Sequence, residues 1–299
     1  MSNVYDLIII GGGPAGLTAS IYASRAGISY ALLDKGFPGG QIMNTSEVDN
    51  YPGLPAIGGM DLAMKLVDHA QQMGMTPVTE EVTGLDLGGE EKTVRTLGGE
   101  YKAKHVLLCT GASPNMLGAP GEKELRGRGV SYCATCDGAF FRKRIVAVVG
   151  GGDTALQDAL YLSGLCEKVY IIVRRNVFRG ANYLQERVKA KDNIEVLTET
   201  TVASIEGSER VRALVINTPA GIRELAVDGV FVAVGTTPNS QLVKGMVDTT
   251  SGGYVVTDRH CQTSIPGVYA AGDVRDTPLR QILTAAADGA VAVQHMLEA

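Results

Sequence analysis

The sequence predicts an α/β fold of two doubly wound, Rossmann-like domains, the second inserted into the first. Two observations predict it. An apolar strand, a glycine-rich turn and a helical stretch follow one another twice, from Asp6 and again from Ile145. Two similar segments, 106–115 and 230–239, each end in Pro-Asn and lie on either side of the second unit. A chain of 299 residues is long enough for two domains.

The first unit has the pattern of a dinucleotide-binding site. The apolar run 7–10 leads into Gly11-Gly12-Gly13-Pro14-Ala15-Gly16, with the spacing G-x-G-x-x-G. In this motif the first glycine permits a tight turn, the second lets backbone approach a pyrophosphate, and the third packs helix on strand. Asp34 ends the next strand, where a carboxylate can accept hydrogen bonds from ribose hydroxyls. This unit therefore predicts a nucleotide with a free 2′-hydroxyl, such as FAD or NAD.

The second unit repeats the turn without the acid. It reads Gly150-Gly151-Gly152-Asp153-Thr154-Ala155. When the two units are aligned on their glycines, Val173 falls opposite Asp34, and Arg174, Arg175 and Arg179 come next. Arginine forks bind a phosphate bidentately, whereas an acid repels it. The second unit thus predicts NADPH. The alternative is a solvated basic edge with counter-charges.

The Pro-Asn segments predict where the chain passes between domains. Gly111 and Gly235 interrupt the two segments before the prolines, as in turns. The first domain is expected at 1–113 and 239–299, and the second at 114–238. Within the first domain the pattern predicts a helix over 59–73, antiparallel strands over 82–106, a strand over 268–271 and a helix over 279–297.

Cys133-Ala134-Thr135-Cys136 is predicted to be a redox pair, because two cysteines three positions apart can close and reopen a small disulfide ring. The alternative is half a zinc site. Zinc needs four ligands, the chain has no second CxxC, and its four histidines are scattered, so no metal is expected. Asp137 follows directly. From the residues alone it is either a group that moves a proton or a turn residue in Asp-Gly.

Composition excludes several classes of function. The net charge of −5 gives no basic footprint for nucleic acid. No apolar run approaches the length of a membrane span, and the N-terminus lacks the features of a signal peptide. Five cysteines, an odd number, indicate a reducing compartment, hence the cytoplasm, and not a disulfide framework.

Over nearly its whole length the sequence resembles the low-molecular-weight thioredoxin reductases. The resemblance rests on the two glycine motifs, Gly39-Gly40-Gln41, the stretch Cys133 to Gly138, the three arginines, Gly272-Asp273 and Arg280-Gln281. It implies a homodimer that passes electrons from NADPH through FAD and the Cys133–Cys136 disulfide to the disulfide of thioredoxin. It also implies that the inserted domain rotates between the two half-reactions.

The resemblance further assigns roles to residues. Cys136 would face the flavin, Cys133 would attack the partner's disulfide, and Asp137 would be the general acid and base. Beyond the first glycine motif and Asp34, the expected FAD residues are Gly39, Gly40, Gln41, Asn50, Val82, Thr110, Gly111, Gly272, Asp273, Arg280, Gln281 and Ile282. The expected NADPH residues are Gly150, Gly152, Asp153, Thr154, Arg174, Arg175, Arg179 and Gly235.

The chain departs from the family at Val173, where a histidine is usual before the paired arginines. Some relatives take electrons from reduced ferredoxin and lack the arginines, which this chain retains. Similar motifs would also suit a dithiol oxidase that passes electrons to oxygen, a hydroperoxide-reductase flavoprotein or a redox-sensing scaffold without turnover.

Overall fold

The computed structural model describes residues 4–45, 48 and 50–298, which form two compact units. The first unit comprises Met1–Ser113 and Thr237–Ala299, and the second comprises Pro114–Thr236. The chain therefore leaves the first unit after Ser113 and re-enters it at Thr237, whereas the sequence places the return at 239. The predicted fold class, two Rossmann-type α/β domains, is confirmed.

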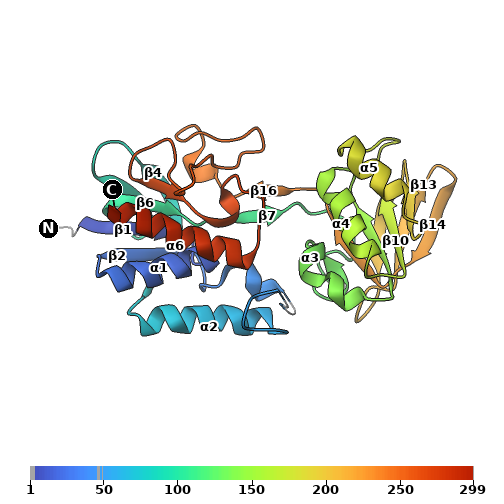
Figure 1. Cartoon of the computed structure of the whole chain (residues 1–299), viewed down its shortest axis with the longest axis horizontal. Coiled ribbons are helices and arrows are strands. Elements are labelled where there is room, and N and C mark those ends of the chain that lie inside the picture. Colours follow the sequence, from blue (N-terminus) through green and yellow to red (C-terminus); the bar gives the residue numbers. More distant parts are fainter. Residues whose placement is uncertain (1–3, 46–47, 49, 299) are drawn as a thin grey trace. The chain divides into compact units, whose positions relative to one another are not determined.

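A seven-stranded sheet forms the centre of the first unit (Figure 1). Its parallel strands are β1 (Val4–Ile10), β2 (Tyr30–Asp34), β3 (Pro77–Thr79), β6 (Glu100–Leu108) and β17 (Val268–Ala270). The antiparallel strands β4 (Val82–Asp86) and β5 (Lys92–Thr96) extend it, as predicted. The long strand β6 pairs with β5 along its first half and with β17 along its second half. The carboxyl ends of β1, β6 and β17 consequently meet at one edge.

Helices cover one face of this sheet. They are α1 (Pro14–Ala26), α2 (Gly59–Gln72) and α6 (Ile282–Glu298). The unit also contains the short 3₁₀ turns η1 (Gly40–Asn44), η3 (Gln241–Val243) and η4 (Gly272–Val274), and Val243 and Val274 pack with the core on the other face. Helix α1 starts at Pro14, whose fixed φ suits a first helical position, and ends at Gly27 in the left-handed region. Figure 1 shows α6 lying along α1. Apolar side chains of β1, α1 and α6 form the core between helices and sheet.

The second unit holds a five-stranded parallel sheet and a separate antiparallel sheet. The parallel sheet has the order β11 (Ile194–Leu197), β10 (Lys168–Ile172), β9 (Ile145–Val149), β15 (Gly229–Val232) and β8 (Val130–Ser131). The antiparallel sheet, which the sequence did not predict, consists of β12 (Thr201–Glu206), β13 (Ala213–Thr218) and β14 (Gly221–Ala226). The helices are α3 (Ala134–Asp137), α4 (Asp153–Ser163) and α5 (Asn182–Lys189), with the turn η2 (Gly138–Phe141).

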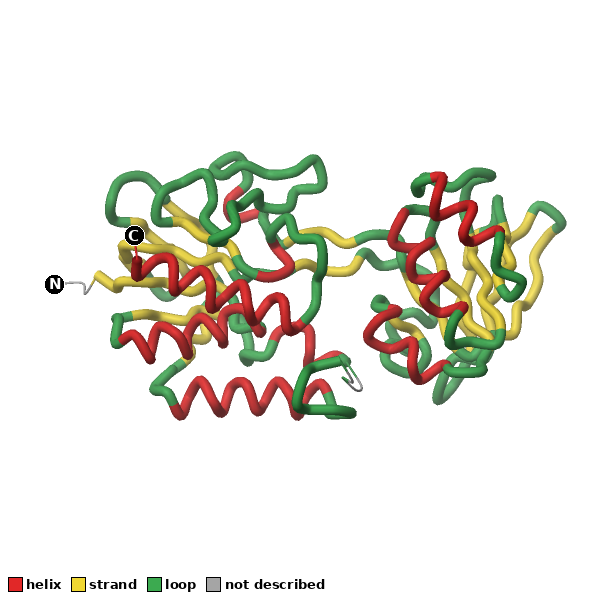
Figure 2. Tube along the Cα trace, viewed as in Figure 1, coloured by secondary structure: helices red, strands yellow, loops and turns green. Residues whose placement is uncertain are grey.

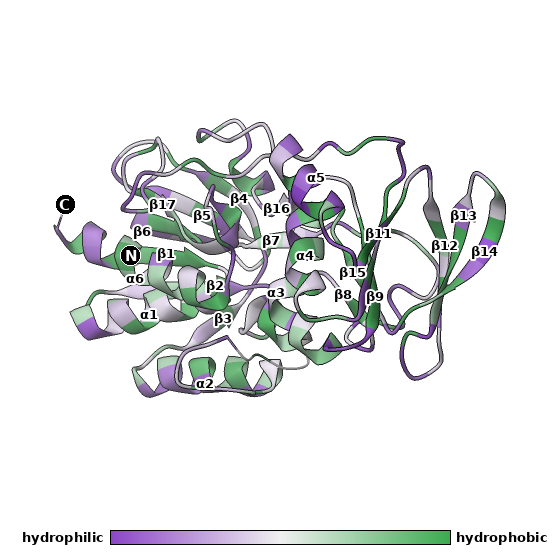
Figure 3. Cartoon of the chain, turned by 45° about the vertical axis from the view of Figure 1, so that its right-hand side comes forward, coloured by the Kyte–Doolittle hydropathy of each residue, from purple (hydrophilic) through white to green (hydrophobic). Residues whose placement is uncertain are grey.

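Central strands are apolar on both faces, as strands covered on both sides must be. In Figure 3 the central strand β9 is coloured for hydrophobic residues, and four of its five residues are buried.

Two short paired strands, β7 (Ala112–Pro114) and β16 (Thr236–Pro238), carry the chain out of the first unit and back (Figure 2). The two Pro-Asn segments bond to each other reciprocally. The Asn115 N–H donates to the Gly235 carbonyl at 3.0 Å, and the Asn239 N–H donates to the Gly111 carbonyl at 2.9 Å. Gly111 and Gly235 have positive φ, +68° and +105°, so the repeated glycine serves the same turn twice.

Helix α6 begins three residues later than the predicted 279. The Gln281 N–H donates to the Thr284 hydroxyl at 3.1 Å, and the Gln281 carbonyl accepts from the Ala285 N–H at 3.0 Å. These bonds satisfy groups at the helix start, so Gln281 is its cap and Leu279 lies before it. Within the described residues, no helix combines the length and apolar character needed to cross a membrane.

Candidate nucleotide and redox sites

The glycine turn after β1 is built as the motif requires. Gly11 has a φ of +106°, and a Cβ there would lie 2.4 Å from the Cys109 carbonyl oxygen. A Cβ on Gly16 would lie 1.9 Å from the Gly11 oxygen, so helix and turn pack backbone to backbone. At Gly13 a Cβ would meet only the Gly40 Cα, at 3.9 Å. The peptide before Pro14 and Ala15 therefore remains approachable, next to the positive end of α1.

Asp34 already holds this turn in place. One carboxylate oxygen accepts from the Gly12 N–H at 2.6 Å, and the other accepts from the Gly36 N–H at 2.9 Å. Each oxygen keeps a further lone pair, so the carboxylate can still accept from a ribose hydroxyl.

The loop at 39–41 lies against the same turn. A Cβ on Gly40 would approach the Gly13 Cα to 3.0 Å, and Gly40 has a φ of +66°. The Gln41 side chain donates to the Ala112 carbonyl. Further along, the Asn50 amide donates to the Gln281 side chain at 3.0 Å. The structure thus brings together predicted residues that lie far apart in the sequence.

Thr110 and Val82 occupy different surroundings. The Thr110 hydroxyl donates to the Asn239 carbonyl at 2.7 Å, and the Asn239 amide donates to the Thr110 carbonyl at 2.8 Å. These bonds fix Thr110 and the neighbouring Gly111 after β6. Val82 is a buried member of the sheet core, so its side chain has no polar role and only its backbone can serve a nucleotide.

The Gly272–Asp273 turn and Arg280 complete the candidate FAD site. Gly272 has a φ of +77°, and a Cβ there would touch the Cβ atoms of Ala15 and Ala285, both at 3.3 Å. Burial raises the pKa of the Asp273 carboxyl, and the Arg280 guanidinium opposes that shift. Arg280 lies over the Tyr254 ring, 4.0 Å from its centroid.

The donor set at this site fits FAD. In the described part of the chain the buried Nε of Arg280 has no hydrogen-bond partner. A buried donor without a partner is costly, and an acceptor atom of a bound cofactor would satisfy it. The approachable peptide at Gly13 suits a pyrophosphate, the Asp34 carboxylate suits a ribose, and the Arg280 Nε suits a flavin.

The second unit repeats the turn after β9. Gly150 has a φ of +155°, and a Cβ there would lie 2.3 Å from the Ala233 oxygen. A Cβ on Gly152 would meet nothing within 4 Å, so this peptide is approachable beside Thr154 at the start of α4. The Asp153 carboxylate accepts from the Ala181 N–H at 2.7 Å and so holds the loop before α5.

The three arginines predicted to bind the 2′-phosphate are exposed. Arg174 and Arg175 follow β10, and the Arg179 N–H donates to the Gly151 carbonyl at 2.7 Å. Among the residues that the structure describes, no carboxylate forms an ion pair with any of the three side chains. Arginines that are not neutralised in this way, beside a glycine turn, favour a phosphate over the alternative of a neutralised basic edge. Val173 is 4% exposed and packs in the core.

Cys133 and Cys136 form a disulfide, with 5.3 Å between their Cα atoms. Cys133 precedes α3 and Cys136 lies within it, so one short helix presents both sulfurs and Asp137. The Cys133 N–H donates to the Ser131 hydroxyl at 3.1 Å, which fixes the approach from β8. The other cysteines, Cys109, Cys166 and Cys261, are buried, and burial raises the pKa of each thiol, so they are poor nucleophiles.

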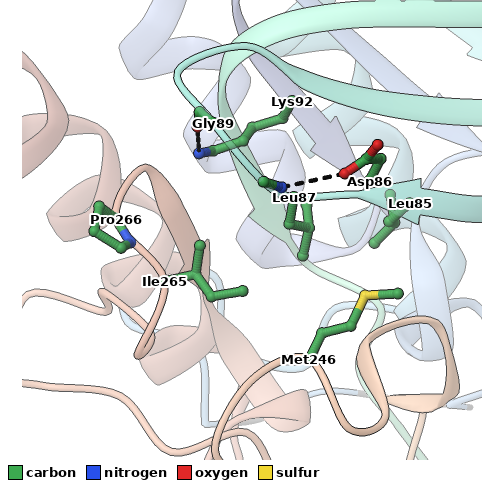
Figure 4. Close-up of a pocket in the computed structure, with 9 residues that line it drawn as sticks. Leu85, Asp86, Leu87, Gly89, Lys92, Met246, Ile265 and Pro266 are labelled. Atoms are coloured by element: carbon green, nitrogen blue, oxygen red, sulfur yellow. Dashed lines mark hydrogen bonds between the residues drawn. The ribbon is translucent and has the colours of Figure 1, made fainter.

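The described residues form no metal site, and one pocket in the first unit is separate from the predicted FAD residues. No group of three or more His, Cys, Asp or Glu side chains is arranged to hold a metal ion. A pocket beside the β4–β5 hairpin contains none of the predicted FAD residues (Figure 4). It is lined by Leu85, Asp86, Leu87, Gly88, Gly89, Lys92, Met246, Ile265 and Pro266.

Sequence reasoning missed three residues of the candidate FAD site. Asn239 fixes Thr110, Tyr254 supports Arg280, and Asp288 binds the Gly272 N–H at 3.0 Å. Asp288 left a signal in the sequence, since it is a lone acid in an alanine-rich helical stretch. Asn239 is visible in the repeated Pro-Asn segments, which mark the crossing between the units but not the bonds to Thr110. Tyr254 left no signal, because its contact with Arg280 is long-range.

Comparisons with known proteins agree with the motifs. Residues 5–289 match the family described as pyridine nucleotide-disulphide oxidoreductase. A thioredoxin reductase of Listeria monocytogenes is 43% identical over 296 residues, which cover 98% of this chain and 93% of that protein. A thioredoxin reductase of Bacillus subtilis is 42% identical over 302 residues, covering 99% and 96%. The crystal structure of thioredoxin reductase from Streptococcus pyogenes has a TM-score of 0.95 at 42% identity, covering 100% and 98%. The family and these relatives imply FAD and NADPH as the cofactors.

Proposed function

The chain belongs to the pyridine nucleotide-disulphide oxidoreductase family, and we propose that it is a thioredoxin-disulfide reductase that uses NADPH and FAD. The observation that carries the proposal is a Cys133–Cys136 disulfide on the same unit as the three exposed arginines. Reduction of a disulfide by NADPH requires both a redox-active disulfide and a site that binds NADPH.

The residues of each unit have separate tasks. In the first unit, the Gly13 peptide, Asp34, Asp273 and Arg280 bind and orient FAD. In the second, Gly152 and Thr154 approach the pyrophosphate of NADPH, and the arginines bind its 2′-phosphate. FAD, when bound, accepts a hydride from NADPH and passes two electrons on to a disulfide.

The disulfide chemistry belongs to the chain itself. Two electrons and two protons convert the Cys133–Cys136 disulfide to a dithiol. The Cys133 thiolate then attacks one sulfur of the thioredoxin disulfide and forms a mixed disulfide. Cys136 attacks Cys133, which restores the protein disulfide and releases thioredoxin as a dithiol. Asp137, at the end of the same helix, supplies and accepts the protons as general acid and base.

The inserted unit is proposed to rotate between the two half-reactions. The sulfurs and the arginines lie on this one unit, and both the nicotinamide and the disulfide must exchange electrons with the flavin. Strands β7 and β16 carry the chain between the units and are the natural hinge, because a few residues there can absorb the change in φ and ψ.

A homodimer in the cytoplasm completes the proposal. Large apolar side chains on α1, α2 and α6 remain exposed on the single chain, and a second copy would cover them. They are Tyr22, Met60, Met64, Leu283, Val291 and Leu297. Three buried free thiols suit a reducing compartment. Sedimentation equilibrium of the FAD-loaded protein tests the dimer, which a monomeric mass at micromolar concentration would rule out.

Turnover with thioredoxin tests the function. We expect NADPH oxidation that requires both FAD and oxidised thioredoxin and releases one thioredoxin dithiol for each NADPH consumed. Oxygen consumption with a dithiol substrate in the absence of NADPH would instead indicate a dithiol oxidase. A ferredoxin-dependent enzyme would show no NADPH oxidation. The three retained arginines argue against this alternative, because they suit the 2′-phosphate of NADPH.

A further inference from the structure

Asp288 on α6 forms the most buried ion pair in the described part of the chain. One carboxylate oxygen lies 2.7 Å from Nη1 of Arg275, and the two side chains are 16% and 15% exposed. In every other ion pair of the described residues, both side chains are at least 32% exposed. The other oxygen of Asp288 accepts from the Gly272 N–H at 3.0 Å. A single carboxylate thus holds the turn that carries Asp273.

The adjacent residue fixes the position of this carboxylate. A Cβ on Gly289 would lie 2.1 Å from the Ala15 carbonyl oxygen, so α6 touches the first turn of α1 backbone to backbone. Gly272 packs between Ala15 and Ala285, as described above. Helix α6 therefore sets the distance between the glycine motif and the Gly272–Asp273 turn, and Asp288 bonds that turn to the helix.

Arg275 extends the connection to Arg280. Its Nε donates to the Thr257 hydroxyl at 2.9 Å, and its backbone carbonyl accepts from Nη2 of Arg280 at 3.4 Å. The Arg280 guanidinium is thereby held by this hydrogen bond and by its contact with the Tyr254 ring, while its Nε is left for an acceptor. Asp288 connects to Asp273 through Gly272 and to Arg280 through Arg275.

We propose that Asp288 is a positioning residue for FAD, which fixes Asp273 and Arg280 through Gly272 and Arg275 without touching the cofactor. This inference rests on the FAD site proposed above. A carboxylate is required because it has two acceptor oxygens for two donors. An asparagine of the same shape has one acceptor oxygen, and its NH₂ group would face either the guanidinium or the Gly272 N–H.

The test is FAD release from the holoenzyme on dilution, followed by the recovery of free flavin fluorescence. Asp288→Asn should raise the FAD dissociation constant about 10- to 100-fold, the loss expected for hydrogen bonds to a charged group. The matched control is Asp6→Asn. Asp6 also accepts from a backbone N–H and a cationic side chain in the same unit, from Ser29 and Lys104. It lies near the amino end of β1, away from the FAD residues.

A double-mutant cycle separates positioning from general stability. If Asp288 acts through Asp273 and Arg280, its substitution in an Asp273→Asn, Arg280→Ala background should add less than about threefold to the dissociation constant. The flavin visible band of Asp288→Asn should also shift, whereas that of Asp6→Asn should not.

Full additivity in this cycle, or an effect of Asp288→Asn no larger than that of Asp6→Asn, would overturn the inference. Failure of the proposed FAD site would look different. In that case the Asp273→Asn, Arg280→Ala background itself would bind FAD as tightly as the unmodified chain.

Discussion

The Asp34 carboxylate and the Gly12 peptide in the first unit have a counterpart in Val173 and Gly151 in the second. Asp34 bonds the Gly12 N–H at 2.6 Å, and its Oδ2 lies 3.1 Å from where a Gly12 Cβ would be. The Val173 Cγ1 lies 2.9 Å from the same point on Gly151. One repeat therefore places an acid, and the other an apolar side chain, beside the nucleotide turn. A carboxylate at this position would repel a 2′-phosphate, so the apolar Val173 leaves the second turn compatible with NADPH.

This difference predicts the nucleotide preference. Replacing Arg174 and Arg175 with alanine should raise the KM for NADPH about 10- to 100-fold per arginine, because each loses a charge-assisted contact with the 2′-phosphate. The KM for NADH should change little. Steady-state kinetics with both nucleotides measure this, and Arg187→Ala, an exposed arginine on α5, is the control. Equal losses with both nucleotides would place the 2′-phosphate elsewhere.

The two sulfurs are predicted to differ in role. Cys136→Ser should abolish turnover and leave the Cys133 thiol able to form a mixed disulfide with thioredoxin that nothing resolves. Non-reducing electrophoresis and mass spectrometry should detect this adduct. Cys133→Ser should abolish turnover without the adduct, and Cys166→Ser should retain activity because that thiol is buried. An adduct with Cys133→Ser and none with Cys136→Ser would reverse the assignment.

Glu122 should stabilise the segment that precedes Cys133 in the second unit. It is 1% exposed, and its carboxylate accepts from the Leu117 and Gly118 N–H groups at 2.8 and 2.7 Å and from the Tyr132 hydroxyl at 2.8 Å. Burial and the hydrogen bond to the Glu122 carboxylate raise the pKa of the Tyr132 hydroxyl. Glu122→Gln should lower the free energy of unfolding by about 2–4 kcal/mol, since an amide oxygen cannot serve three donors.

The measurement for Glu122 is urea unfolding of the FAD-loaded protein. Glu124→Gln, an exposed glutamate two positions away, should change the midpoint little. Equal midpoints for the two variants would show that the three bonds contribute nothing to stability.

Asp158 on α4 should make stability depend on pH. Burial raises its pKa from 3.8 to about 7. Between these values the folded chain holds a proton that the unfolded chain has lost, so stability falls as pH rises from about 4 to about 7. Asp158→Asn should therefore stabilise the protein by on the order of 2–4 kcal/mol at about pH 8 and by almost nothing near pH 4.

Urea unfolding at both pH values measures the effect of Asp158. The control is Asp192→Asn, an exposed acid in the same unit. A stabilisation that is the same at both pH values would show that the partly buried Asp158 carboxyl does not titrate as described.

Local patterns explain why much of the fold was predictable. A strand, a glycine turn and a helix are encoded within about 30 consecutive residues, so β1 with α1 and β9 with α4 could be located from sequence. The start of α6 could not be placed to the residue: the Thr284 hydroxyl and Gln281 peptide start the helix at Ile282, and an apolar periodicity does not reveal a cap. The strands at 201–226 pair with one another on a separate sheet, which apolar patterning did not mark.

The candidate sites were predictable where a motif is contiguous. Gly11 to Gly16 and the CxxC each carry their chemistry in a few adjacent residues. Support for those residues is long-range: Asp288 meets Gly272 across 16 positions, and Asn239 meets Thr110 across 129. Such partners depend on how α6 and the crossing strands pack, which a single sequence does not reveal.

Anaerobic titration of the FAD-loaded protein with NADPH tests the central claim most directly. The flavin visible band reports electron arrival, and the chain has no tryptophan to interfere with a parallel flavin fluorescence signal. We predict loss of the band at near-stoichiometric NADPH and much weaker loss with NADH. No loss with either nucleotide would contradict it, and would show that the arginines beside Val173 do not deliver NADPH to this flavin.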